Sequence, residues 1–318
     1  MIKHHKHNEI DKQKWDEAIT SSKNPLIYAY SWWIDTVCPN WEALIENDYE
    51  TMVPLTCRKK YGVNYLFQPH FTQQLGVFSK EKITSEKVEM FINSTPKKYS
   101  YIDICLNSCC HVNPNSSVGI SKKDSSLAPK MTFSKNVNYE LKLNLTYESL
   151  QKAYSENTKR NIKKAGKNAL KIHKNKVGLE KIIQLFKQSN KAAKNLKKDY
   201  FEVLKKIESE SIKRNLSEIL SVHDETGKLL AAALFITSFN RKFFLFSGNS
   251  EEGKKTGAMP FLLDSFIKRN SETETILDFE GSNNPGLARF YQSFGSMETV
   301  YLRVKINRLP KPVKWLKK

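Results

Sequence analysis

The second half of the chain alternates apolar and polar residues with clear periods. From Tyr139 to Leu145 every second residue is apolar, which is typical of a half-buried strand. The period then lengthens to three or four residues. This change predicts helices over 146–169, around Leu179–Phe186 and around Phe201–Ile212, with Thr146 as the N-cap of the first.

Three apolar segments follow these helices and predict an antiparallel meander. They are Glu218–His223, Leu229–Ile236 and Arg241–Phe246. The remaining periodic segments predict, in order, a helix through Met259–Ile267, a strand over Thr275–Glu280, a helix over Asn284–Phe294 and a strand over Tyr301–Ile306. This half therefore has the pattern of a mixed α/β domain.

A polar segment separates this regular half from the first. Residues Asn107–Asn136 are rich in Asn, Ser, Lys and Pro and contain few large apolar side chains, which predicts a long loop or a poorly paired edge. We therefore place a domain boundary near residue 135 and predict two domains, over 1–135 and 136–318.

Composition excludes several classes of protein. Of the 318 residues, 39% are hydrophobic and 11% aromatic, too many for a disordered chain. The longest apolar run, Leu229–Ile236, is too short to cross a bilayer, and the first thirty residues do not resemble a secretory signal. The five cysteines lack the spacing of a disulfide framework. These features predict a soluble protein of the cytoplasm.

The net charge of +19 is concentrated in one segment. Residues Gln151–Asn215 contain 19 basic and 6 acidic side chains. Within the first predicted helix, like charges recur four residues apart, a spacing that costs some stability unless an anion binds there. These candidate phosphate- or acceptor-binding residues are Lys159, Arg160, Lys163 and Lys164. A solvated helix face is the alternative interpretation.

Two motifs near the end of the chain resemble a known family. The sequence LDFEGS at Leu277–Ser282, followed by FYQSFG at Phe290–Gly295, resembles the FemAB-like branch of the GNAT acyltransferase superfamily. Ser155–Ala165 is similar to the basic start of a helix in that branch. The resemblance covers residues 139–307 and extends more loosely to Trp32-Trp33 and Gln68–Gly76. It implies two tandem GNAT-like domains, each a mixed, mostly antiparallel sheet flanked by helices, with the N-terminal domain degenerate.

The resemblance implies an N-acyltransferase that moves an acyl or aminoacyl group from acyl-CoA (for example acetyl-CoA) or aminoacyl-tRNA to an amine acceptor, with a cell-envelope precursor among the candidate acceptors. In GNAT enzymes the residues matching Asn284 and Tyr291 contact the acyl carrier and protonate the leaving group. The two lie seven positions apart and thus on one helix face. Glu280 is the candidate general base, while Asp278 is expected to anchor the following turn.

The same resemblance places the donor along the strand that ends near residue 249. Its carbonyl would lie beside Phe246, Gly248 and Asn249, where a backbone N–H polarises it. Its phosphates would face Lys254, Lys255, Thr256, Gly257 and Ala258 at a helix start. Only Gly257-Ala258 matches the glycine-rich pattern of enzymes that use coenzyme A. The rest of the pattern is missing, which favours aminoacyl-tRNA as the donor.

Other constellations predict less chemistry. Cys105, Cys109, Cys110 and His111 have poor spacing for zinc, so no metal site is expected.

A rival function from another class is a non-catalytic basic module that binds RNA or another anionic ligand on a degenerate GNAT fold. The two functions differ in salt dependence and in whether they require Tyr291.

Overall fold

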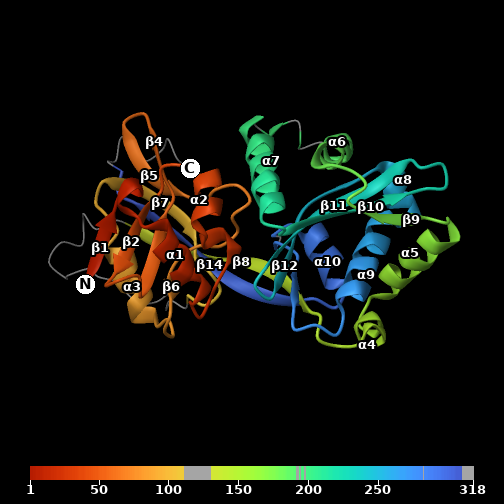
Figure 1. Cartoon of the computed structure of the whole chain (residues 1–318), viewed down its shortest axis with the longest axis horizontal. Helices are drawn as coiled ribbons and strands as arrows, with labels where there is room; N and C mark the ends of the chain where they lie inside the picture. Colours follow the sequence, from red (N-terminus) through yellow and green to blue (C-terminus); the bar gives the residue numbers. More distant parts are fainter. Residues whose placement is uncertain (111–129, 191–192, 194, 197, 282, 310–318) are drawn as a thin grey trace. The chain divides into compact units, whose positions relative to one another are not determined.

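The computed structural model describes residues 1–110, 130–190, 193, 195–196, 198–281 and 283–309 (Figure 1). Its internal contacts divide the chain into two compact units. Unit 1 comprises Met1–Asn136 together with the chain from Val300 onward, and unit 2 comprises Val137–Thr299. Two strands, β8 (Lys130–Lys142) and β14 (Met297–Asn307), cross from one unit to the other.

The described residues of unit 1 form strands of two sheets and three α-helices. The strands of the first sheet lie in the order β1 (Ile2–His5), β2 (Glu42–Glu46), β3 (Thr51–Leu55), β6 (Phe78–Ser79). The neighbouring strands of the second are β4 (Cys57–Lys60), β5 (Val63–Phe67), β7 (Tyr99–Cys105) and β14. The helices are α1 (Lys12–Thr20), α2 (Ser31–Val37) and α3 (Ser85–Asn93).

Buried indole rings organise the core of unit 1. The rings of Trp15 and Trp41 meet at 4.8 Å, and both side chains are fully buried. The indole N–H of Trp15 donates to the Ala29 carbonyl, and that of Trp33 donates to Thr72 Oγ1. These large rings therefore enter the core with their polar atoms satisfied.

The last strand belongs to both units, whereas the predicted division assigned all of 136–318 to the C-terminal domain. Residues Arg303–Asn307 of β14 pair antiparallel with Tyr101–Cys105 of β7. Val304 and Ile306 are buried in the core of unit 1. Because the final residues bury their apolar face there, the structure groups them with the N-terminal part of the chain.

Unit 2 builds a twisted sheet in the order β8, β13, β12, β11, β10, β9. Its strands, besides β8, are β9 (Lys171–Lys174), β10 (Ser217–His223), β11 (Leu229–Ser238), β12 (Arg241–Asn249) and β13 (Ile276–Asp278). Its α-helices are α4 (Tyr147–Lys152), α5 (Glu156–Lys167), α6 (Leu179–Ser189), α7 (Lys198–Lys213), α8 (Glu251–Thr256), α9 (Ala258–Asn270) and α10 (Pro285–Gln292). The predicted meander β10–β11–β12 is antiparallel, as expected.

The structure corrects two predicted elements of unit 2. The expected helix over 146–169 is two helices, because Ser155 caps a new helix start by accepting a hydrogen bond from the Thr158 N–H. The expected strand over 275–280 ends at Asp278, because the left-handed backbone of Glu280 turns the chain.

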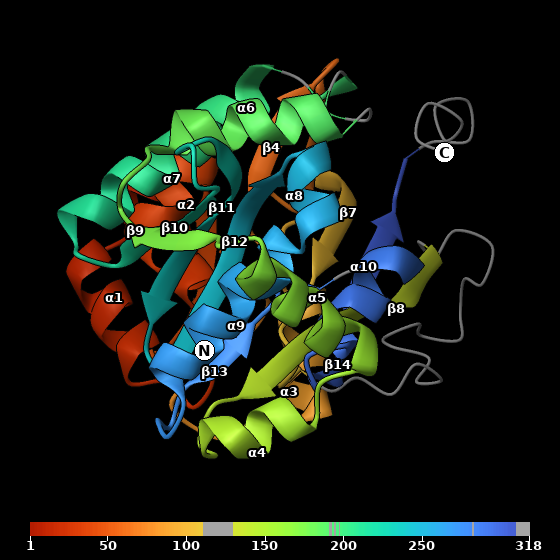
Figure 2. The ribbon, with the colours of Figure 1, turned by 90° about the vertical axis from the view of Figure 1, so that its right-hand side faces the viewer.

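Figure 2 shows α6 and α7 on one face of β10–β12 and α5 and α9 on the other.

A bulge in β12 decides what each face of this sheet contacts. Leu234 pairs with Phe246 and Phe235 with Phe244, so Leu245 is an extra residue on β12. The bulge places the Phe244 and Phe246 side chains on opposite faces. Phe244 joins the core beneath α9, whereas the Phe246 ring packs on Phe186 of α6 at 4.9 Å.

Strands β12 and β13 form a fork. They pair in parallel only where Arg241–Phe243 faces Ile276–Asp278. In contrast, β12 pairs with β11 from Arg241 to Asn249. The two strands therefore share a short base and then separate, with α8 after one branch and the turn at Glu280 after the other.

Candidate functional site

One branch of the fork ends in a constrained carboxylate, Glu280. Its backbone has φ +62°, and that of Gly281 has φ +61°. The Glu280 N–H donates to Asp278 Oδ1 at 2.9 Å. This is the anchoring role expected for Asp278, whose side chain is almost completely buried.

Tyr291 lies beside this turn, inside an aromatic cluster. Its side chain is 8% exposed, and its ring stacks on Phe279 at 4.9 Å with the planes 22° apart. Burial, assisted by the negative charge of Glu280, raises the pKa of Tyr291 to about 12. The phenol therefore remains protonated at neutral pH, as a proton donor must be.

A second phenol that the sequence did not indicate lies near the same carboxylate. Tyr200, in the first turn of α7, has its pKa raised to about 12 by burial and then by the charge of Glu280. Tyr200 and Tyr291 are far apart in the sequence, so only the packing of α7 and α10 could reveal that they share a neighbour. The chain thus brings Glu280, Tyr200 and Tyr291 together beside the fork. We call these three residues the carboxylate–phenol group.

Asn284 acts as a helix cap. It is the N-cap of α10, and its Oδ1 accepts hydrogen bonds from the N–H groups of Gly286 at 2.8 Å and Leu287 at 3.3 Å. Pro285 occupies the first turn, where its missing N–H does no harm. The predicted contact of Asn284 with the acyl carrier is a separate role that remains a proposal.

The other branch of the fork carries the residues expected around the donor carbonyl. A Cβ at Gly248 would lie 2.6 Å from both the Ile182 carbonyl oxygen and the Leu185 Cβ, so Gly248 lets α6 approach β12. The buried Oδ1 of Asn249 has no hydrogen-bond partner within the described part of the chain. Of the three predicted residues, Phe246 and Gly248 thus have packing roles, whereas Asn249 keeps an unused acceptor.

The segment expected to cradle phosphates is helical and tightly packed. Lys254 and Thr256 lie in α8, where Lys254 pairs with Glu251 at 2.6 Å. Gly257 has φ +80°, and a Cβ there would lie 2.4 Å from the Asn161 carbonyl oxygen of α5. Ala258 is fully buried. The N-terminus of α9 is therefore covered by α5, and phosphate binding by these residues stays a prediction.

The same contact brings together two basic segments that are far apart in the sequence. Because Gly257 packs on Asn161, α5 lies against the junction of α8 and α9. Lys159 pairs with Glu156 at 3.0 Å. Four other cations are exposed and make no ion pair with the residues that the structure describes: Arg160, Lys163, Lys164 and Lys255. We call these four residues the basic strip.

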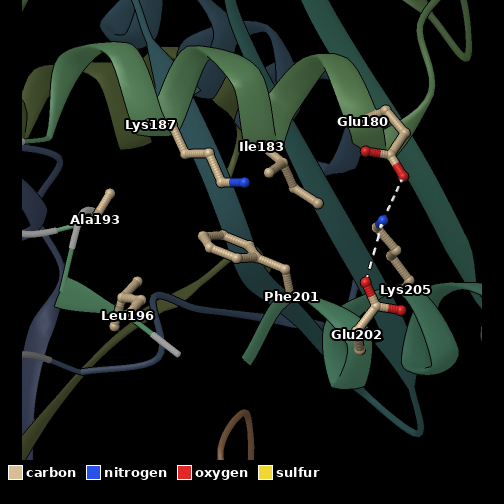
Figure 3. A pocket seen from close by; sticks show the side chains of 8 residues that line it. All are labelled: Glu180, Ile183, Lys187, Ala193, Leu196, Phe201, Glu202 and Lys205. Carbon is tan, nitrogen blue, oxygen red and sulfur yellow. Dashed lines mark ion pairs between the residues drawn. The ribbon is translucent and has the colours of Figure 1, made fainter. Parts of the chain in front are cut away.

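A cleft of about 560 Å³ opens between α6 and α7 (Figure 3). Ile183 and Phe201 form part of its apolar lining, and the ammonium group of Lys187 lies 4.4 Å from the centre of the Phe201 ring. At its other end, Lys205 pairs with Glu180 at 2.8 Å. Phe201 follows Tyr200 directly, so α7 contributes to both this cleft and the carboxylate–phenol group.

The described residues contain no group of three or more His, Cys, Asp or Glu side chains suited to a metal ion. Cys105 and Cys110 are buried thiols, and Cys109 is exposed. The fourth residue of that constellation, His111, lies outside the described residues. Within the same described part of the chain, no helix is long and apolar enough to cross a membrane.

Comparison with solved structures identifies the fold. The chain is similar to FemX, with a TM-score of 0.65 at 13% identity, covering 96% of this chain and 98% of that one. It is also similar to the C-terminal domain of a putative lysylphosphatidylglycerol synthetase from Agrobacterium fabrum, with a TM-score of 0.54 at 9% identity and coverage of 96% and 95%. L-PGS from Bacillus licheniformis gives a TM-score of 0.52 at 11% identity, with the same coverage.

No family model and no curated protein matches the sequence. At such low identities the structural similarity establishes the fold and not the reaction. The predicted tandem GNAT-like fold of the FemAB type is confirmed, because the similarity to FemX extends over nearly the full length of both chains.

Proposed function

We propose that this protein transfers an aminoacyl group from a charged tRNA to an amine acceptor. The observation that carries the proposal is the contact between Gly257 and Asn161. It covers the helix start at which GNAT enzymes are expected to hold the pyrophosphate of coenzyme A, and it places the basic strip beside that start. A polyanionic donor has charged groups to bind there, whereas a single pyrophosphate lacks its cradle.

The name of one structural neighbour supports an aminoacyl product. Lysylphosphatidylglycerol synthetase is named for a lysyl group attached to a lipid. By itself this similarity concerns the fold, and the proposed donor rests on the basic strip. Since charged tRNA is a cytoplasmic molecule, the proposal also places the reaction in the cytoplasm.

The carboxylate–phenol group supplies the proton transfers that this reaction needs. Glu280 accepts a proton from the acceptor ammonium group, and the free amine nitrogen attacks the ester carbonyl to form the amide C–N bond. The C–O bond to the ribose then breaks as Tyr291 donates its proton to the ribose oxygen. The nitrogen of the new amide gives its extra proton to the Tyr291 phenolate, and Glu280 releases its proton to solvent. At the other branch of the fork, the unused Oδ1 of Asn249 is our candidate contact to the donor.

The raised pKa of Tyr291 keeps its phenol protonated at neutral pH. An alkoxide is a far stronger base than a phenolate, so proton transfer from Tyr291 to the departing ribose oxygen is favourable.

The donor is tested by binding. We expect filters to retain the complex of the protein with a mixture of tRNAs charged with radiolabelled amino acids, and calorimetry with acetyl-coenzyme A to give no heat. Arg160→Glu combined with Lys164→Glu should weaken tRNA binding at least tenfold. A matched control combines Lys181→Glu with Lys206→Glu, two exposed lysines on α6 and α7. Micromolar binding of acetyl-coenzyme A would instead assign a thioester donor.

The reaction is tested by following the labelled aminoacyl group from base-labile ester to base-stable amide. Three amine probes cover different acceptor classes: glucosamine, lysine and vesicles that contain phosphatidylethanolamine. Amide formation with any probe supports the transferase. Retention of charged tRNA without amide formation from any probe would favour the non-catalytic binding module.

A further inference from the structure

Glu280 has a backbone conformation that is unusual for a residue with a Cβ. Its φ of +62° lies in the left-handed region, and Gly281 continues the turn with φ +61°. For residues other than glycine this conformation costs about 1–2 kcal/mol, so surrounding contacts must hold it. The Glu280 N–H donates to a carboxylate oxygen of Asp278 at 2.9 Å, and a charged acceptor strengthens such a bond.

Asp278 is itself fixed from two neighbouring strands. It is the last residue of β13 in register with β12, at the base of the fork, and its side chain is 2% exposed. Arg241 Nη1 of β12 lies 3.0 Å from Oδ2, and Asn138 Nδ2 of β8 donates to Oδ1 at 3.0 Å. Arg241 also pairs with Glu140 of β8 at 2.9 Å. The carboxylate therefore has a defined position before it accepts the Glu280 N–H.

Phe279, the residue between these two carboxylates, connects them to the ring of Tyr291. The Phe279 ring stacks on Tyr291, and the Phe279 N–H donates to the Tyr139 carbonyl of β8 at 3.0 Å. In this short segment the side chains of Asp278 and Phe279 and the backbone N–H groups of Phe279 and Glu280 thus each have a defined contact. The charge of Glu280 contributes to the raised pKa of both Tyr200 and Tyr291, which agrees with a carboxylate held near both rings.

We propose that Asp278 is a positioning residue: its buried carboxylate, held by Arg241 and Asn138, locks the turn that brings the Glu280 carboxylate to the phenols of Tyr200 and Tyr291. The consequence for transfer rests on the proposed function. The consequence for the environment of the two phenols does not, because it requires neither donor nor acceptor.

Fluorine NMR of the full chain labelled with 3-fluorotyrosine measures this geometry directly. Tyr200→Phe and Tyr291→Phe assign the two signals, and Glu280→Gln defines how both signals shift when the charge is lost. We expect Asp278→Leu to shift both signals in the same direction as Glu280→Gln does. Signals that stay at their wild-type positions in Asp278→Leu would overturn the proposal.

Two further variants separate positioning from general effects. Glu140→Gln removes a charge from the same cluster without touching the Glu280 N–H, and we expect both signals to stay in place. If Asp278→Leu does not fold, Asn138→Leu makes the same test, because it removes one contact of Asp278 and retains every charge. Unchanged signals in Asn138→Leu would then contradict the positioning role.

Transfer kinetics give an independent comparison. Loss of a general base lowers turnover about 10²- to 10⁴-fold. If Asp278 acts through Glu280, Asp278→Leu in the Glu280→Gln background should lower kcat less than about twofold further. If the two residues acted independently, their separate fold-losses in kcat would multiply. Absence of transfer by the wild-type protein contradicts the proposed function and leaves the fluorine result to decide on Asp278.

Discussion

At the scale of single residues, Tyr291 combines a packing role with a chemical one. Its ring belongs to the core of unit 2, stacked on Phe279, while its hydroxyl lies within the electrostatic influence of Glu280. Replacement by Phe preserves the ring and removes only the hydroxyl. This substitution therefore separates the two roles.

We expect Tyr291→Phe to lower the transfer rate well over tenfold while donor binding changes less than twofold. The reason is that the hydroxyl acts on the leaving oxygen after binding is complete. Single-turnover transfer from labelled aminoacyl-tRNA and filter binding measure the two quantities. Tyr61→Phe, at an exposed position in unit 1, is the control. Wild-type turnover in Tyr291→Phe would remove this phenol from the mechanism.

Asp278 makes a second prediction, on pH and stability. Burial is the main cause that raises its pKa to about 6, against the opposing effect of Arg241. Since the folded-state pKa lies above the unfolded value, folding favours the protonated form, and this contribution to stability is lost as pH rises through about 6. From pH 7 to pH 5 we expect the wild type to gain stability relative to Asp278→Asn, by on the order of 1 kcal/mol. Urea unfolding at both pH values measures the difference. An equal change in the free energy of unfolding of the two proteins would contradict the prediction.

At the scale of elements, glycines decide how closely helices approach one another and the sheet. Gly248 admits α6 onto β12, and Gly257 admits α5 onto the junction of α8 and α9. The second contact has two consequences: it covers the start of α9 and it aligns the basic strip. Gly257 therefore permits the close packing of α5 against the start of α9.

The glycines of this region predict opposite effects of the same substitution. Gly257→Ala places a Cβ 2.4 Å from the Asn161 oxygen at a positive φ, and we expect it to lower the free energy of unfolding by about 2 kcal/mol or more. Gly166→Ala, inside α5 with no atom within 4 Å of the added Cβ, should raise it by about 0.5–1 kcal/mol. Urea denaturation measures both values. Equal effects would show that the contact at Gly257 is not tight.

At the scale of the whole molecule, the net charge of +19 has both a general and a local meaning. A basic protein attracts any polyanion at low salt. The basic strip adds a local concentration of cations that make no ion pair among the described residues. Salt dependence distinguishes these two contributions, because it counts the phosphates that a protein neutralises.

The logarithm of the tRNA binding constant should fall linearly with the logarithm of salt concentration. Each phosphate contact on a duplex contributes about −0.9 to the slope. Arg160→Ala with Lys164→Ala should therefore make the slope shallower by about two units. Lys181→Ala with Lys206→Ala keeps the wild-type slope if the strip is the binding surface. Equal changes in the two double variants would mean that binding depends only on the total charge.

The sequence by itself determined the fold class of unit 2 and most of its elements, although it missed β9 and α8 and merged α4 with α5. The alternation through Tyr139–Leu145 and the three apolar segments of the meander are local periodic patterns. Such patterns are visible in the sequence without knowing which elements pack against one another. The motifs around Asp278 and Tyr291 pointed to the fold shared with FemX. Capping of α10 by Asn284 is also a local feature, because a cap bonds only to the next few N–H groups.

Tertiary structure alone decided which of these residues meet. Tyr200 joins Glu280 and Tyr291 only because helices distant in sequence pack on one sheet. The start of α9 is covered because α5, from a much earlier part of the chain, contacts Gly257. Strand β14 extends into unit 1 because its apolar residues are buried there. Periodicity reports that a residue has a buried face, whereas the identity of its neighbour depends on long-range packing.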